Sequence, residues 1–214
     1  AEKQGYPHFM LKEIHEQPEA FVKTVNTRIK NGLPDFSDDG ISDQLLQKIN
    51  KIYVVACGSA MHAGLVGKHL IEHLAGIPVS VEIASEFRYS QPFISEKTLA
   101  IFVSQSGETA DTLASLRLAK HYGAQIISIV NVRGSAIAKE SDNVIFTKAG
   151  REIAVATTKA YSAQLAAFYA LAIFIGREKG KLSAEQEEKY IKELYLLPQK
   201  TKETLEMVNE IAKT

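Results

Sequence analysis

The sequence predicts an α/β fold: a doubly wound parallel sheet flanked by helices, a flavodoxin-like sandwich. Short, continuously apolar runs alternate with helical stretches through the middle of the chain. Strands that are apolar throughout are typical of a parallel sheet covered on both faces. Polar turns rich in Ser and Thr follow several of these runs. In such sheets ligands bind beyond the carboxyl ends of the strands, at the point where the strand order reverses.

An N-terminal helical arm and loop, residues 1–45, precede the sheet. Apolar residues at helical spacing predict helix over residues 9–32, with Pro18 at a break or in the first turn of a second helix. Turn-forming residues fill 31–40, and a short helix over 42–50 leads into the first strand.

The sheet domain is expected at residues 46–180. Its helix at 157–177 is apolar nearly all round, which predicts burial. The longest apolar run, Leu165–Ile175, is too short to cross a bilayer, which needs about 20 residues. The predicted strands are 51–57, 79–83, 98–104, 125–130 and 143–147, and the other helices are 60–75, 110–122 and 134–140.

The tail, residues 181–214, is charged and carries an apolar stripe at helical spacing. It is expected to be helical, with Pro198 at a break or in a new first turn. Because it has no core of its own, we expect it to pack on the sheet domain or on something outside this chain.

Composition excludes several function classes. Lys plus Arg and Asp plus Glu both number 25, so no net charge recruits nucleic acid or an anionic membrane. A single cysteine, Cys57, excludes an intrachain disulfide and a Cys-rich zinc site, which fits a cytoplasmic protein. Residues 1–17 are charged and lack the apolar core of a signal peptide.

The turn after the strand 98–104 predicts a phosphate site. Ser104, Ser106 and Thr109 supply hydroxyls, Gln105 an amide, and Gly107 lets the backbone approach closely. A helix follows, and its first N–H groups and positive dipole end favour an anion. The turn contains no Lys or Arg, which favours a single phosphate over a nucleotide triphosphate. The alternative is a cluster of capping residues.

Two further strand ends carry similar turns, one at 57–59 and one at 154–159. Together the three turns would form a shallow polar pocket suited to a phosphorylated polyol. Read separately, Ser59 and Thr157 are equally consistent with ordinary helix N-caps.

Aldose–ketose chemistry needs a base near neutral pH, and the chain offers only weak catalytic candidates, Glu152 and Lys159. The alternatives are a solvated loop acid for Glu152 and an exposed lysine for Lys159. His62, His69 and His73 share one helical face but have no carboxylate or Cys at matching spacing, so we expect no metal. No G-x-G-x-x-G follows a strand, and no cofactor is expected.

Six segments carry a family resemblance: Met10–Pro18, Cys57–Ser59, Glu82–Tyr89, Ser104–Thr112, Asn131–Ser135 and Glu152–Lys159. Together they resemble the glutamine–fructose-6-phosphate aminotransferase family, also called glucosamine-6-phosphate synthase. The serine turn alone marks the broader sugar isomerase (SIS) superfamily. Within the synthase, the chain is similar to the first of two SIS domains.

The resemblance implies a role for six residues. In the family, the serine turn holds the substrate phosphate, the position of Ser59 touches the sugar, and the Val155 region lines the pocket. One departure is Ala60, where the family usually has a hydroxyl; its loss removes one bond, worth about 1 kcal/mol. The implied substrate-binding residues are Ser59, Ser104, Gln105, Ser106, Thr109 and Val155.

The resemblance further implies that this chain is a fragment. The family's glutaminase begins with a nucleophilic cysteine, whereas this chain begins with Ala1, and the isomerase acids and bases would lie beyond Thr214. We therefore expect a homodimer that binds fructose 6-phosphate or glucosamine 6-phosphate without turning it over. The alternatives are a SIS-type phosphosugar isomerase or deaminase, and a sugar-phosphate sensor, for which no DNA-binding arm is visible.

Overall fold

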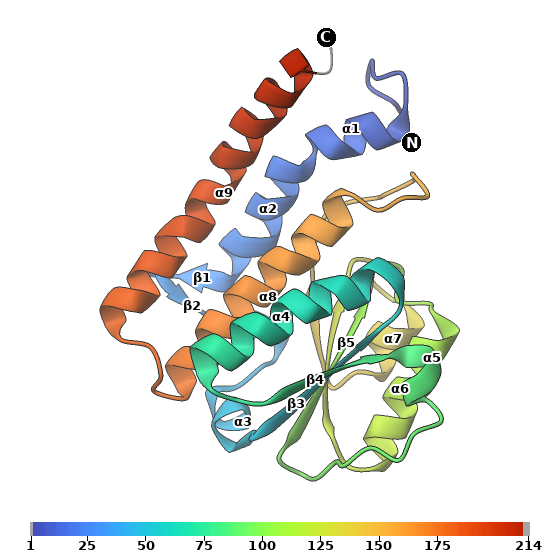
Figure 1. Cartoon of the computed structure of the whole chain (residues 1–214), viewed down its shortest axis with the longest axis vertical. Coiled ribbons are helices and arrows are strands. Elements are labelled where there is room, and N and C mark those ends of the chain that lie inside the picture. Colours follow the sequence, from blue (N-terminus) through green and yellow to red (C-terminus); the bar gives the residue numbers. More distant parts are fainter. Residues whose placement is uncertain (1, 212–214) are drawn as a thin grey trace.

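A five-stranded, all-parallel sheet forms the centre of the computed structural model, which describes residues 2–211 (Figure 1). The strand order β4-β3-β5-β6-β7 confirms the doubly wound prediction, because the chain winds outward in both directions from β3 and β5. Those two strands pair in register from Lys51 with Thr98 to Ala56 with Val103. The strands are β3 Lys51–Ala56, β4 Val79–Ile83, β5 Thr98–Ser104, β6 Gln125–Val130 and β7 Asn143–Phe146.

Helices cover both faces of the sheet. Alternate residues of β3 enter the two cores: Ile52 and Val54 pack on the side of α4 and α8, Tyr53 and Val55 on the other side. This explains why the strands are apolar at every position. The helices of the first side are α4 Gly58–Ala75 and α8 Lys159–Glu178; those of the second are α5 Ala84–Phe87, α6 Ala110–His121 and α7 Ala136–Glu140.

The buried helix α8 packs closely against α4. At Gly67 a Cβ would lie 2.4 Å from the Phe168 ring, so only glycine permits this approach. The helix is longer than the apolar run seen in the sequence, and by length and composition it could cross a membrane. However, 78% of that stretch is buried inside the fold, as expected for a core helix.

The N-terminal arm is not one continuous helix. It forms α1 Phe9–His15 and α2 Gln17–Val25, with Pro18 in the first turn of α2 as predicted. The prediction of helix up to residue 32 was wrong, because Asn31 and Gly32 adopt positive φ and turn the chain into a hairpin. The remaining elements are η1 Asn26–Arg28, β1 Ile29–Lys30, β2 Leu33–Pro34, η2 Ser37–Asp39 and α3 Asp43–Lys48.

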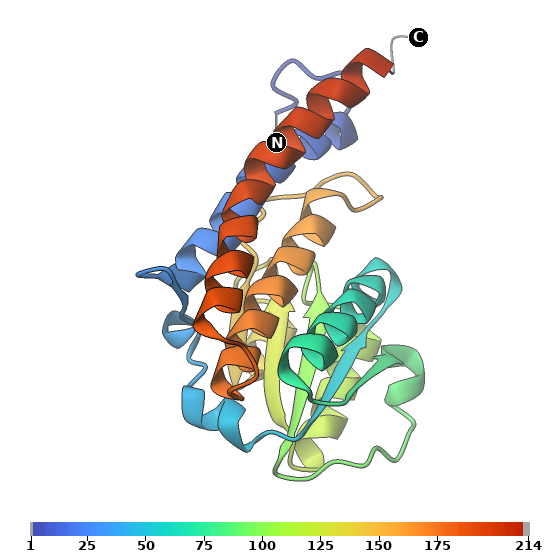
Figure 2. The same cartoon turned by 60° about the vertical axis from the view of Figure 1, so that its left-hand side comes forward.

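The tail forms one helix, α9 Ala184–Ile211, and the expected break at Pro198 was wrong. Pro198 removes one N–H donor from the backbone hydrogen bonds of the helix. Buried Ile191 and Leu194 anchor the turns before it. After it, the Thr201 hydroxyl donates to the carbonyl of Leu197. The helix packs on α2 and α8, and its far end extends with α1 beyond the sheet domain (Figure 2). Ala1 and residues 212–214 lie outside the described residues, and the division at 45 and 180 stays a prediction.

Candidate functional site

A cleft of about 420 Å³ lies at the carboxyl ends of β3 and β5, where the strand order reverses. It brings together all six predicted binding residues, although their role as ligands stays a prediction. Glu152 also lines the cleft, and the other predicted catalytic candidate, Lys159, does not. The lining residues are Cys57, Ser59, Ala60, Val103, Ser104, Gln105, Ser106, Thr109, Glu152, Ala154, Val155, Ala156, Thr157 and Gln164.

The serine turn is held by its own hydrogen bonds. The buried Ser104 hydroxyl accepts from the amide of Gly107 at 3.0 Å and lies 3.2 Å from the Thr109 hydroxyl. The Ser106 hydroxyl accepts from the amide of Glu108 at 3.2 Å. Thr109 is the N-cap residue of α6, yet its side chain makes no capping hydrogen bond, so it does not cap the first turn of the helix.

Gly107 is required by the shape of this turn. Its φ is +68°, and a Cβ at this position would lie 2.1 Å from the Ser135 hydroxyl oxygen. Both the positive φ and the close approach therefore demand glycine. The neighbouring Glu108 accepts from the amide of Ala136 at 2.9 Å, at the start of α7, which gives it a capping role outside the cleft.

The turn after β3 presents Ser59 to the cleft. Helix α4 begins at Gly58, so Ser59 lies within its first turn and Cys57 is the N-cap residue. The reading of Ser59 as an N-cap was therefore wrong. Ser59 is exposed, and Ala60 beside it also lines the cleft.

Glu152 lines the cleft, but its carboxylate is occupied by hydrogen bonds from residues at the start of α8. Its carboxylate accepts from the amides of Thr158 at 2.9 Å and Ala160 at 3.1 Å, and from the Thr157 hydroxyl at 2.9 Å. It caps α8 from six to eight residues upstream, a longer reach than the usual capping box. Neither reading of Glu152 from the sequence anticipated this, and Thr157 is not the N-cap residue.

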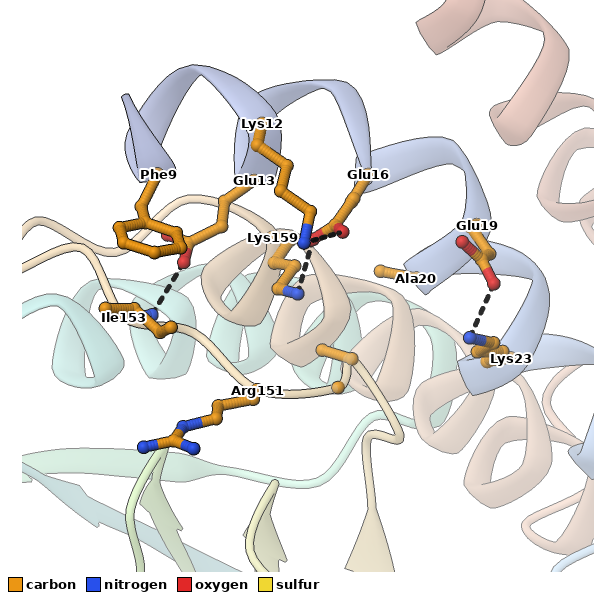
Figure 3. A pocket seen from close by; sticks show the side chains of 12 residues that line it. Phe9, Lys12, Glu13, Glu16, Glu19, Ala20, Lys23, Arg151, Ile153 and Lys159 are labelled. Atoms are coloured by element: carbon orange, nitrogen blue, oxygen red, sulfur yellow. Dashed lines mark hydrogen bonds and ion pairs between the residues drawn. The ribbon is translucent and has the colours of Figure 1, made fainter. Parts of the chain in front are cut away.

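Lys159 lies in a separate cavity of about 260 Å³ beneath α1 and α2 (Figure 3). It is only 4% exposed, so the expectation of a solvated lysine was wrong. Its Nζ lies 2.6 Å from Oε2 of Glu16, which explains how a cation is tolerated in the first turn of a helix. Burial raises the pKa of the Glu16 carboxyl, but ion pairs with Lys159 and Lys12 more than offset this and hold the pKa below its ordinary value.

Within the described residues, no group of three or more His, Cys, Asp and Glu side chains could hold a metal ion. The rings of His69 and His73 stack with centroids 6.3 Å apart on the exposed face of α4.

Comparison with known proteins identifies the family. A family model described as SIS domain matches residues 45–174, which is more than half of the chain. The chain belongs to the SIS domain family. The matched range coincides with the sheet and the helices that cover it, and it contains the whole cleft.

Named relatives extend the similarity of this SIS domain to the arm and the tail. Glutamine–fructose-6-phosphate aminotransferase (isomerizing) of Clostridium tetani is 55% identical over 100% of the chain, and that of Caldanaerobacter subterraneus is 50% identical over 100%. The chain spans 35% of the length of each. The C-terminal domain of the Francisella tularensis aminotransferase superposes with a TM-score of 0.89 at 42% identity, over 93% of this chain and 56% of that one.

Proposed function

We propose that the SIS domain binds a sugar phosphate in the cleft at the ends of β3 and β5, with the phosphate on the serine turn. One observation carries the proposal: hydroxyl, amide and helix N-terminus groups converge there, and none of the described lining residues is Lys or Arg. Neutral donors and a helix dipole suit one phosphate group. The sugar would then lie between Ser59 and the segment that contains Val155.

The relatives' names favour fructose 6-phosphate as the ligand, with glucosamine 6-phosphate as its aminated product. We propose that the chain supplies the phosphate-binding SIS domain of such an aminotransferase, as a cytoplasmic homodimer. Glu152 is engaged with three donors, and Lys159 lies in another cavity. The cleft therefore offers no free general base, and we expect binding without turnover.

Calorimetric titration of the chain with fructose 6-phosphate, glucosamine 6-phosphate and inorganic phosphate tests the site. We expect both sugar phosphates to bind more tightly than inorganic phosphate. The substitution Ser106→Ala should raise the Kd of all three ligands about 10-fold, since it removes a hydrogen bond to the charged phosphate group. Ser141→Ala is the matched control, because that hydroxyl bonds Ile137 on α7 outside the cleft.

Three outcomes would contradict the proposal. Equal affinity for fructose 6-phosphate and inorganic phosphate would mean that the sugar is not recognised. An unchanged affinity of Ser106→Ala would remove the phosphate from the serine turn. Formation of glucosamine 6-phosphate or an isomerised sugar by the chain alone would refute the expected lack of turnover.

A further inference from the structure

Besides the serine turn, the cleft is lined by Glu152 and residues 154–157, which form its second wall, while Ile153 lines the cavity under α1. None of residues 152–157 lies in a helix or strand. Val155 at the tip of this segment is fully exposed, so its side chain is not packed into the core. A segment of this kind stays in one place only if other groups hold its backbone.

Glu13 of α1 holds the middle of this segment. Its carboxylate accepts from the amide of Ile153 at 2.6 Å (Figure 3). It also accepts from the amide of Ala154, at 3.2 and 3.3 Å. Glu13 is only 2% exposed. A buried carboxylate is tolerated only where donors compensate for lost water, and here backbone amides of the cleft wall are the donors.

A second contact holds the chain just beyond the wall. Glu16, the residue between α1 and α2, pairs with Lys159, the first residue of α8. Lys12 lies 3.4 Å from Glu16 and adds a second cation. The two carboxylates thus contact the chain on either side of Val155. We call Glu13 and Glu16 the α1 clamp.

We propose that Glu13 is a positioning residue of the sugar-phosphate site, which fixes the wall that faces the sugar while leaving the phosphate seat unaffected. This inference rests on the proposed function. The serine turn is held by bonds within residues 104–109, by contacts to the start of α7 and by the amide of Asn131, which donates to the carbonyl of Gln105; none of these contacts involves α1. Without the clamp, the wall would be in its binding position in a smaller fraction of the molecules. The apparent affinity for the sugar phosphate would fall in proportion to that fraction.

The test compares Glu13→Gln with Glu19→Gln. Glutamine keeps the size of Glu13 but removes its charge, and its amide nitrogen replaces an oxygen that accepts from the amide of Ala154. Glu19 lines the same cavity, but its side chain is 64% exposed, and among the residues that the structure describes its ion-pair partner is Lys23. We expect Glu13→Gln to raise the Kd for fructose 6-phosphate about 10-fold and that for inorganic phosphate less than about 2-fold. Glu19→Gln should change neither.

Hydrogen exchange of residues 153–157 gives a second readout, and Glu13→Gln should accelerate it without accelerating exchange in β5. If Glu13→Gln does not fold, Glu13→Asp serves instead, because it keeps the charge and moves the carboxylate by one methylene. Equal weakening for both ligands, or weakening for neither, overturns the inference. The proposed function fails separately, when the unaltered chain does not prefer fructose 6-phosphate to inorganic phosphate.

Discussion

The two walls of the cleft are held by contacts from different parts of the chain: the serine turn from the end of β6 and from α7, the second wall from α1. The serine turn closes on itself through hydrogen bonds between residues two to five positions apart. The second wall has local bonds from Glu152 to Thr157 and Thr158, but its middle is held by Glu13, which is 140 residues away from Ile153 in the sequence. The comparison teaches that one site can combine a wall held within the sheet domain with a wall whose middle is held by a helix from the N-terminal arm.

This difference matches the two parts of the proposed ligand. A phosphate needs converging donors in a fixed small turn, which a short stretch of chain can provide. A sugar presents a larger and more varied surface, and recognising it needs a second wall at a defined distance. That wall gains its position from α1.

The largest expected effect comes from breaking the local wall. Gly107→Ala should lower the free energy of unfolding by about 3 kcal/mol or more, because it combines a positive φ with an overlap against Ser135. Gly123→Ala is the control: its φ is +89° but nothing lies within 4 Å of the added Cβ, so it should cost about 1 kcal/mol. Urea unfolding measures the free energy of unfolding of both variants. Equal losses would show that the overlap between the new Cβ and Ser135 does not contribute.

A smaller effect is expected at the distant wall. Lys159→Met leaves the partly buried Glu16 with Lys12 alone and should cost about 2 kcal/mol of unfolding free energy. The matched control, Lys23→Met, breaks an ion pair whose partners are 51% and 64% exposed and should cost less than about 0.5 kcal/mol. Thermal unfolding distinguishes the two, and similar losses would mean that the α1 clamp contributes no more than a surface pair.

The smallest effect is a dependence on pH. The pKa of Glu16 in the folded state lies below its ordinary value of 4.5, so its contribution to stability is present above pH 4.5 and is lost as the pH falls through the folded-state pKa. Glu16→Gln should therefore be less sensitive to acid than the unaltered chain. Urea midpoints from pH 7 to about pH 3 would check this, and parallel curves for the two proteins would argue against it.

The contrast between local and distant contacts also explains what the sequence could predict. The strands and the serine turn were predicted because apolar runs and hydroxyl-rich turns are local patterns. The resemblance then selected the six binding residues, which the fold brings to one cleft. The hairpin at 29–34 was missed because its strands have two residues each, too few to show alternation.

The roles of Glu13 and Glu16 had no local signal. In the sequence Glu13 is one charged residue of an amphipathic helix, and nothing near it indicates burial. The first-turn position of Lys159 is unfavourable for a cation unless a carboxylate or ligand needs it, but the sequence does not say that this carboxylate is Glu16. Pro198 is a related case: a local rule predicted a break, and packing against α2 and α8 prevailed.

The separation between Glu13 and Ile153 also sets an order of assembly. A loop as short as the serine turn can close within about 100 ns, whereas the contact from α1 requires the intervening sheet to exist first. During refolding we expect the ability to hold phosphate to precede the ability to distinguish a sugar. Under mild denaturation these two abilities should be lost in the reverse order. The preference for a sugar phosphate over inorganic phosphate should disappear first, while phosphate binding persists.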